Sequence, residues 1–265
     1  MPDNSSSTDD STADQDAAKF AEVASGIYRR FDAEAVSMAL QHAVREQLFS
    51  QQPTIMLMFV RIAEIYPAAA ATLRQQQSDV SGPLRQAIDL ILDPPQDIRD
   101  AKYLPHSIQS PGEMDLCWAE FLVTGKTEIV HKIVSVLDRE DQTREFLNTQ
   151  LTNEPGGLQL SDTERMELQQ FGIGLGKPTD DSHWQVMTEG DTDLFLWLGI
   201  KDQNKLCVRI FEAMNDSQKL HIANKGAALW SLQANATQHG AIRLLCNEAA
   251  EADGGFGRKL LTPSS

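Results

Sequence analysis

Hydrophobic residues recur along most of this chain with the 3.6-residue period of an α-helix, and almost nowhere with the period of two that marks a β-strand. The first part of the chain predicts three such helices: residues 36–48 after Asp32, residues 55–66 with Pro53 in the first turn, and residues 84–92 before Pro94. A proline is tolerated in a first turn because that N–H has no intrahelical acceptor. Pro67, by contrast, is expected to kink or restart the second helix.

Further along, three stretches pair a tryptophan-containing helix with a second amphipathic helix across a short turn. They span about residues 114–137, 194–214 and 223–249. The spacing from each tryptophan to the next helix is uneven, so a strict repeat is absent. The pattern predicts an all-α fold, an irregular array of antiparallel helix hairpins that forms either a repeat-like α-solenoid or a compact multi-helix domain.

Composition shifts suggest where these helical parts begin and end. The expected parts are a disordered acidic tail (1–16), an N-terminal helical part (17–93), a proline-rich connector (94–112), a helix-hairpin part (113–252) and a flexible tail (253–265). A connector with this little helix or strand pattern is either a subdomain boundary or a groove-lining segment. The pattern leaves open whether the two helical parts form one domain.

Charge and cysteine usage exclude several classes of function. The formal net charge is −15 and no basic cluster is present, which argues against a nucleic-acid partner and allows a basic protein partner. The three cysteines are far apart, which favours buried free thiols in a reducing compartment over disulfides or a zinc site. The most apolar segment, residues 53–73, contains Arg61 and Glu64, and the N-terminus lacks a signal-peptide pattern. We therefore expect a cytoplasmic protein with no membrane partner.

The segment AALWSLQANATQHG, residues 227–240, holds the main candidate chemistry. Ser231, Asn235 and His239 share one helical face, with Gln238 beside it. They form either a polar active-site stripe or the packing face and end of one helix. A Ser231–His239 dyad fails on geometry, because their Cα atoms would lie about 12 Å apart on a helix.

In the structural interpretation of this segment, each residue has a place. His239 lies in the last turn, where its charge complements the helix dipole, and Gly240 takes the left-handed position that follows. The Trp230 indole packs in the core, on a face of small residues: Ala223, Gly226, Ala227 and Ala234.

Two other motifs are weaker. The run Gly172–Thr179 lacks phosphate-loop spacing and follows a helical pattern, so it is expected to end a helix and lead into the loop of residues 180–184. Asp191 and Asp193 match only two positions of a calcium loop, and residues 188–191 are better explained as capping before Leu194. We therefore assign no catalytic residue, no metal ligand and no cofactor.

Two segments resemble a group of uncharacterised bacterial all-helical proteins. The resemblance implies shared helical hairpins and brings no known activity. The first segment matches at Pro111, Asp115, Leu116, Trp118, Phe121, Thr124 and Gly125. The second matches at Trp230, Ser231, Leu232, Asn235, Ala236, Gln238 and His239.

Two hypotheses about function follow. The first is a helical protein-interaction or scaffold protein without enzymatic activity, which binds another protein and, in its specific version, a basic one. The alternative is a small-ligand-binding protein or hydrolase with a site where the Trp118 and Trp230 hairpins meet. The binding residues would be Asp115, Trp118, Ser231, Asn235, Gln238 and His239.

Overall fold

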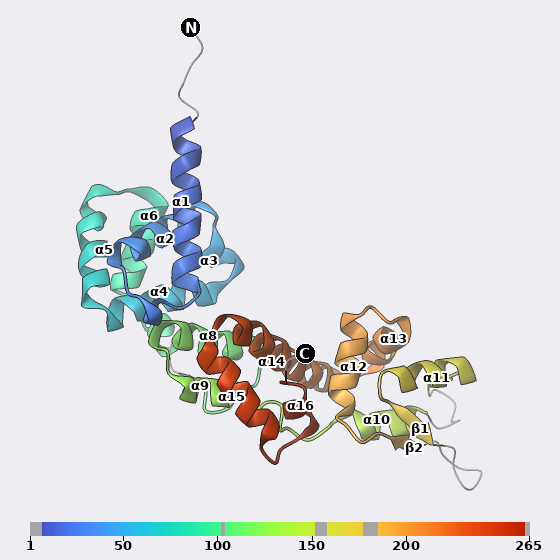
Figure 1. The fold of residues 1–265 in the computed structure, drawn as a ribbon. Helices are drawn as coiled ribbons and strands as arrows, with labels where there is room; N and C mark the ends of the chain where they lie inside the picture. The colour runs from blue at the N-terminus through green and yellow to red at the C-terminus, as the bar shows by residue number, and fades with distance from the viewer. Residues whose placement is uncertain (1–6, 102–103, 152–157, 177–184, 263–265) are drawn as a thin grey trace. The chain divides into compact units, whose positions relative to one another are not determined.

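The computed structural model describes residues 7–101, 104–151, 158–176 and 185–262, and the chain divides into two compact units. The first unit comprises residues 1–107 and 112–130, and the second comprises residues 108–111 and 131–265. Helices build both units, and the described part of the second also contains a two-stranded sheet (Figure 1). These elements confirm the predicted all-α, multi-helix fold.

The helices predicted for the first part of the chain are present. The elements of the first unit are α1 (Ser7–Ala24), η1 (Ile27–Arg29), α2 (Ala33–Arg45), α3 (Leu48–Gln51), α4 (Pro53–Ile65), α5 (Pro67–Asp79), α6 (Gly82–Leu92), α7 (Gln96–Ala101) and α8 (Pro111–Thr124). Asp32 caps α2 by accepting from the N–H groups of Glu34 and Ala35. Pro67 restarts the chain as a new helix, at 110° to α4.

The helix α1 replaces most of the disordered tail that was predicted for residues 1–16. Asp16 is buried, and its Oδ2 lies 3.0 Å from Nη1 of Arg45 on α2. Val23 is part of the core of the first unit. An ion pair and an apolar contact therefore hold the end of a segment whose composition alone indicates disorder. Residues 1–6 lie outside the described residues.

The proline-rich connector is also more ordered than predicted. It contains α7, and Pro111 already begins α8. The division between the units falls within α9 (Thr127–Val134), so the first predicted hairpin, α8–α9, is not contained in one unit. The chain also changes unit within the connector, because residues 108–111 belong to the second unit, so the connector is only one part of the division between the units.

Charged and aromatic side chains join α8 to the rest of the first unit. Arg61 on α4 donates to both carboxylate oxygens of Glu120, at 2.7 and 3.0 Å. The hydroxyl of Tyr66 donates to the carbonyl of Val123 at 2.9 Å. At the end of α8, Gly125 has a φ of +70° and lies against the ring of Tyr28. Among the described helices, no single one is long and apolar enough to cross a bilayer, although α4 and α5 pass that test as a bent pair.

The second unit contains the other two predicted hairpins. Its elements beyond α9 are α10 (Thr143–Gln150), α11 (Asp162–Gln170), β1 (Gly174–Gly176), β2 (Gln185–Met187), α12 (Thr192–Lys201), α13 (Lys205–Ala213), α14 (Asp216–Gln238), α15 (Gly240–Glu251) and α16 (Phe256–Lys259). The pairs α12–α13 and α14–α15 are the hairpins. Their core includes Leu196, Cys207 and Ile222.

The glycine-rich run does more than end a helix. After α11, Gly172 takes a φ of +74°, and the chain continues as β1, which pairs antiparallel with β2. Leu175 is opposite Val186 in this register, and both side chains are buried. A strand this short shows too few alternations for its period to be recognised in the sequence. The predicted loop of residues 180–184 lies outside the described residues.

The C-terminal segment is packed, whereas a flexible tail was predicted for residues 253–265. Arg258 on α16 donates to both oxygens of Asp138, and Leu261 is buried. Residues 263–265 lie outside the described residues.

The structure also corrects the packing expected on α14. The small residue Gly226 does allow a close approach, but the indole that lies against it belongs to Trp197 of α12. Trp230, predicted as core, is 59% exposed. Gly240 does not take a left-handed position, because it begins α15 after the extended residue His239.

Two of the glycines with positive φ, Gly82 and Gly125, allow the cost of backbone strain to be separated from the cost of crowding. Gly82→Ala should cost about 1 kcal/mol, because its φ of +66° is unfavourable but nothing lies within 4 Å of the new Cβ. Gly125→Ala should cost about 3 kcal/mol, because its Cβ would also lie 2.5 Å from Tyr28. Urea unfolding followed by circular dichroism measures both, and equal costs would contradict the close packing at Tyr28.

Candidate functional site

A cluster of buried charged side chains is the most unusual chemical feature of the second unit. Asp191, Asp193, His221 and Lys225 are all buried, and Lys225 and Asp193 have no exposed surface. Burying a charge is costly unless it is paired and hydrogen-bonded. The packing around these residues must therefore supply their partners.

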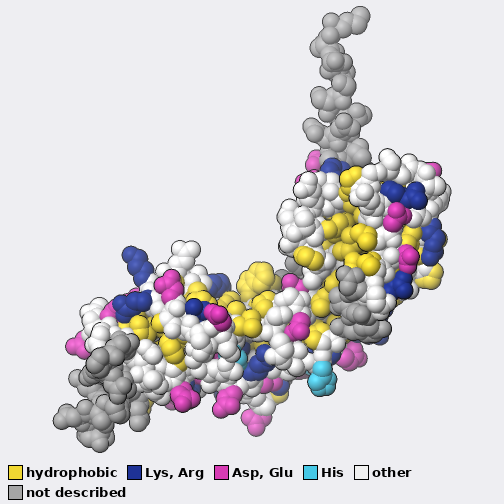
Figure 2. All heavy atoms as spheres, turned by 180° about the vertical axis from the view of Figure 1, so that it is seen from behind, with side chains coloured by type: hydrophobic (Ala, Val, Ile, Leu, Met, Phe, Trp, Pro, Cys, Tyr) yellow, Lys and Arg dark blue, Asp and Glu magenta, His cyan; other side chains and the backbone are white. Residues whose placement is uncertain are grey.

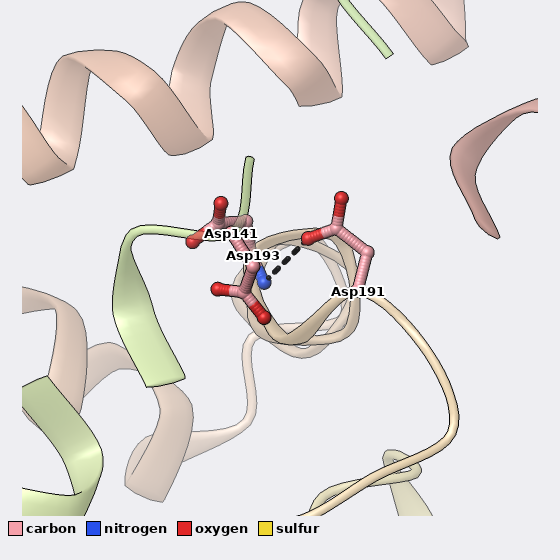
Figure 3. A group of neighbouring side chains, drawn as sticks. All are labelled: Asp141, Asp191 and Asp193. Carbon is pink, nitrogen blue, oxygen red and sulfur yellow. Dashed lines mark hydrogen bonds between the residues drawn. The ribbon is translucent and has the colours of Figure 1, made fainter. Parts of the chain in front are cut away.

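The beginnings of two helices supply the acidic side chains. Asp191 is the N-cap of α12 and accepts from the N–H of Asp193 at 3.0 Å, as the predicted capping before Leu194 requires. Asp141 precedes α10 and accepts from the N–H of Thr143, also at 3.0 Å. Figure 3 shows Asp191 and Asp193 on the first turn of α12, with Asp141 beside them. The partial positive charge of a helix N-terminus stabilises carboxylates in such positions.

Each of these two helix starts is also capped by a carboxylate from the other. Oδ2 of Asp141 accepts from the N–H of Thr192, the first residue of α12, at 2.9 Å. Oδ2 of Asp193 accepts from the N–H of Gln142, the N-cap of α10, at 3.2 Å. These reciprocal bonds fix the start of α10 against the start of α12.

The helix α14 brings the basic side chains to the acids. His221 and Lys225 are four residues apart and therefore lie on one face of α14. Lys225 Nζ lies 2.5 Å from Oδ2 of Asp191 and 3.3 Å from Oδ2 of Asp193. His221 Nε2 lies 2.8 Å from the same oxygen of Asp193. Lys225 therefore bridges the two carboxylates of α12.

The two carboxylates of α12 respond to burial in opposite ways. Burial raises the pKa of Asp191, and the contact with Lys225 offsets only part of that rise. Burial acts in the same direction on Asp193, but its contacts with His221, Lys225 and Thr143 outweigh it, so its pKa is lowered. The fold therefore favours the ionised form of Asp193 and disfavours that of Asp191.

The geometry suggests a metal site at first sight. One oxygen from each of Asp141, Asp191 and Asp193 lies within 4.8 Å of the others, and hard divalent cations prefer such ligands. However, the ammonium group of Lys225 already supplies a cation to two of the three. Since Lys225 and Asp193 are fully buried, we interpret the group as a structural ion cluster.

The predicted binding residues fall in both units. Asp115 and Trp118 lie on α8 in the first unit, whereas Ser231, Asn235, Gln238 and His239 lie at the end of α14 in the second. Asn235 donates to the carbonyl of Ser231 at 2.9 Å, and the Ser231 hydroxyl donates to the carbonyl of Ala228 at 3.2 Å. Two of these side chains thus bond to the backbone of their own helix.

The buried thiols offer no nucleophile. The three cysteines are free and buried, as predicted. Burial raises the pKa of Cys207 and of Cys246 to about 11, so both stay protonated at neutral pH.

One signal for the ion cluster is present in the sequence. Lys225 continues the apolar stripe of Ile222, Leu229 and Leu232, all of which are buried. A lysine in such a stripe must either extend to solvent or find a buried counter-ion. The counter-ions of Lys225, Asp191 and Asp193, lie more than 30 residues before it in the chain, so the sequence alone does not pair them with it.

Comparisons with known proteins add no assignment, since no family model, curated protein or solved structure matches this chain. Function must therefore be inferred from the residues themselves.

The ion cluster predicts unequal costs for two equivalent substitutions. Asp193→Asn should destabilise the second unit by about 3 kcal/mol, because it leaves Lys225 and His221 without their shared carboxylate. Asp191→Asn should cost less, since burial already disfavours this charge and asparagine still caps α12. Urea unfolding followed by tryptophan fluorescence measures the difference. A larger cost at Asp191 would contradict the cluster as described.

The Asp193→Asn variant also tests how the free energy of unfolding depends on pH. The pKa of Asp193 is lower in the folded state, so the unfolded chain binds the proton more tightly. Its stabilisation is therefore complete well above the unfolded pKa of about 3.9 and is lost as the pH falls through the folded pKa. The stability gap between the wild type and Asp193→Asn should narrow on acidification below about pH 3.9. A gap that stays constant would contradict an ionised Asp193.

Proposed function

We propose that this protein acts by binding another protein through the surface of the second unit that carries Trp230. The observation behind the proposal is that Trp230 is 59% exposed, although it lies on the otherwise well-buried helix α14. Leaving so large an aromatic side chain in water gives up the free energy that its burial would contribute. A partner that covers the indole would recover it.

The hairpin α14–α15 carries a second large apolar side chain at its surface. Leu244 on α15 is 63% exposed. Figure 2 shows hydrophobic side chains reaching the surface of both units among acidic and basic ones. Tryptophan is enriched among the few residues that dominate protein–protein affinity, typically within a ring of polar residues. An exposed tryptophan on a rigid helix suits this role.

The charge of the chain favours one kind of protein partner. With a net charge of −15, the protein would repel nucleic acid and attract a basic surface. Charge complementarity mainly raises the association rate and the specificity, whereas burial of the indole would supply affinity. We therefore propose a basic protein with an apolar pocket for Trp230.

The hydrolase alternative receives less support from the same helix. The hydroxyl of Ser231 donates to a carbonyl of its own helix, and the amide of Asn235 does the same. A catalytic serine needs a base within hydrogen-bond reach, and the helical spacing keeps His239 beyond it. We therefore propose no catalytic activity.

An exposed and a packed tryptophan make a matched pair for testing this surface. Trp230→Gln should change the free energy of unfolding by no more than about 0.5 kcal/mol, as for other surface positions. Trp197→Gln should cost about 3 kcal/mol, because the Trp197 indole packs against Gly226. Urea unfolding of the full chain measures both, and a large cost at Trp230 would contradict its exposure.

Binding itself is tested by placing the photo-crosslinker p-benzoylphenylalanine at position 230 of the full chain in its native cells. The expected result is one discrete protein adduct, absent when the crosslinker is placed at Ser217, an exposed position about 140° away around the same helix. The purified partner should then bind the wild type and lose at least about tenfold in affinity with Trp230→Gln. No adduct, equal adducts at both positions, or unchanged affinity would each overturn the proposal.

A further inference from the structure

A cleft in the first unit has the size and lining of a small-molecule site. Its volume is about 490 Å³, and helices α1, α3, α4 and α8 form it. Clefts that bind small molecules commonly span about 300–1,000 Å³ and are mostly apolar. Here the apolar wall includes Leu48, Ile55, Met58, Trp118 and Leu122.

One carboxylate stands in this wall without a partner. Asp115 lines the cleft and makes no hydrogen bond or ion pair with the residues that the structure describes. No lysine, arginine or histidine is among the lining residues described. Asp115 is exposed at the edge of the cleft, and the atoms packed on its other side remove part of its water and raise the pKa of its carboxyl. A bound cation would give Asp115 a counter-ion, which the described residues do not provide.

The tryptophan one turn away places an aromatic ring beside this carboxylate. Asp115 and Trp118 are three residues apart on α8 and therefore neighbours on its surface. Trp118 is only 7% exposed, and its indole Nε1 has no hydrogen-bond partner among the described residues. Indole rings also attract cations. The carboxylate favours a positive charge and the indole ring favours an apolar body, whereas the indole N–H, a donor, does not bond to an ammonium group.

We propose that this cleft binds a small amphipathic amine, with the ammonium group paired to Asp115 and the apolar part against Trp118, Ile55 and Met58. The proposal is independent of the protein interface at Trp230. An amphipathic helix could fill an apolar groove as well, but the single unpaired carboxylate in a cleft of this volume fits one small cation.

Three probes with the same alkyl chain separate charge recognition from hydrophobic binding: octylamine, octan-1-ol and octanoate. Each is titrated below its aggregation concentration into the full chain, with tryptophan fluorescence and calorimetry as readouts. Octylamine should bind about threefold to fivefold more tightly than octan-1-ol, and octanoate more weakly than either. No measurable binding of octylamine, or octanoate binding as tightly, would overturn the proposal.

Single substitutions test whether octylamine binds at Asp115 and Trp118. Asp115→Asn should bring the affinities for octylamine and octan-1-ol together, while Glu128→Gln, which removes an exposed acid of the same unit, should leave their ratio unchanged. Trp118→Phe should abolish the fluorescence response to octylamine, and Trp230→Gln should preserve it. Melting temperatures verify that each variant is folded. An amine preference that survives Asp115→Asn, or a fluorescence response that survives Trp118→Phe, would place the amine elsewhere and overturn the assignment.

Discussion

The ammonium group of Lys225, enclosed without any exposed surface, constrains how α12 and α14 pack in the second unit. An ammonium group taken out of water loses several kcal/mol of solvation, and only well-placed carboxylates can offset the loss. The carboxylates of Asp191 and Asp193 reach Lys225 only when the start of α12 lies beside the middle of α14. A shift of either helix by one residue would leave buried charges unpaired. The cluster therefore selects one register of packing.

That register also determines what the other side of α14 presents. Lys225 and Trp230 are five residues apart, so their side chains project about 140° apart around the helix. The buried ion pairs hold α14 in place on one side. The helix can therefore expose the Trp230 indole on its other side without shifting. Sites on rigid elements lose less conformational freedom on binding than sites on loops. The ion cluster would thus support binding at Trp230 without being reached by the partner.

The sequence predicted the helices better than the order of the terminal segments and the short strands. The prolines at 53 and 67 and the cap Asp32 marked helix starts correctly because these are local rules, decided within one turn. Composition failed for α1 and α16, because ion pairs distant in the chain and buried apolar side chains order segments that look polar and loose. The ion pairs are Asp16 with Arg45 and Arg258 with Asp138, and the apolar side chains are Val23 and Leu261. The strand β1 has too few residues to show a period.

The ion cluster was missed, and Trp230 was wrongly predicted as a core residue, for a related reason. Periodicity tells which residues share a face, but it does not tell which face is covered. Trp230 and Trp197 look alike in the sequence, and only the contact between Trp197 and Gly226 distinguishes the packed indole from the exposed one. Likewise, Lys225 interrupts an apolar stripe, but its counter-ions are distant in the chain. Tertiary pairing of this kind cannot be derived from a local pattern.

The two proposed binding surfaces would depend differently on salt. The attraction of a basic protein to a chain of net charge −15 acts over distances comparable to the Debye length, about 8 Å at physiological ionic strength, and is therefore weakened by added salt. Burial of the Trp230 indole is a short-range, apolar contribution that salt does not screen. At Asp115 the ion pair would be close, but it lies at an exposed edge where screening is effective. Salt should therefore slow association with a protein partner more than it speeds dissociation, whereas for an amine in the cleft it should remove the preference over the alcohol and leave the apolar part of the affinity.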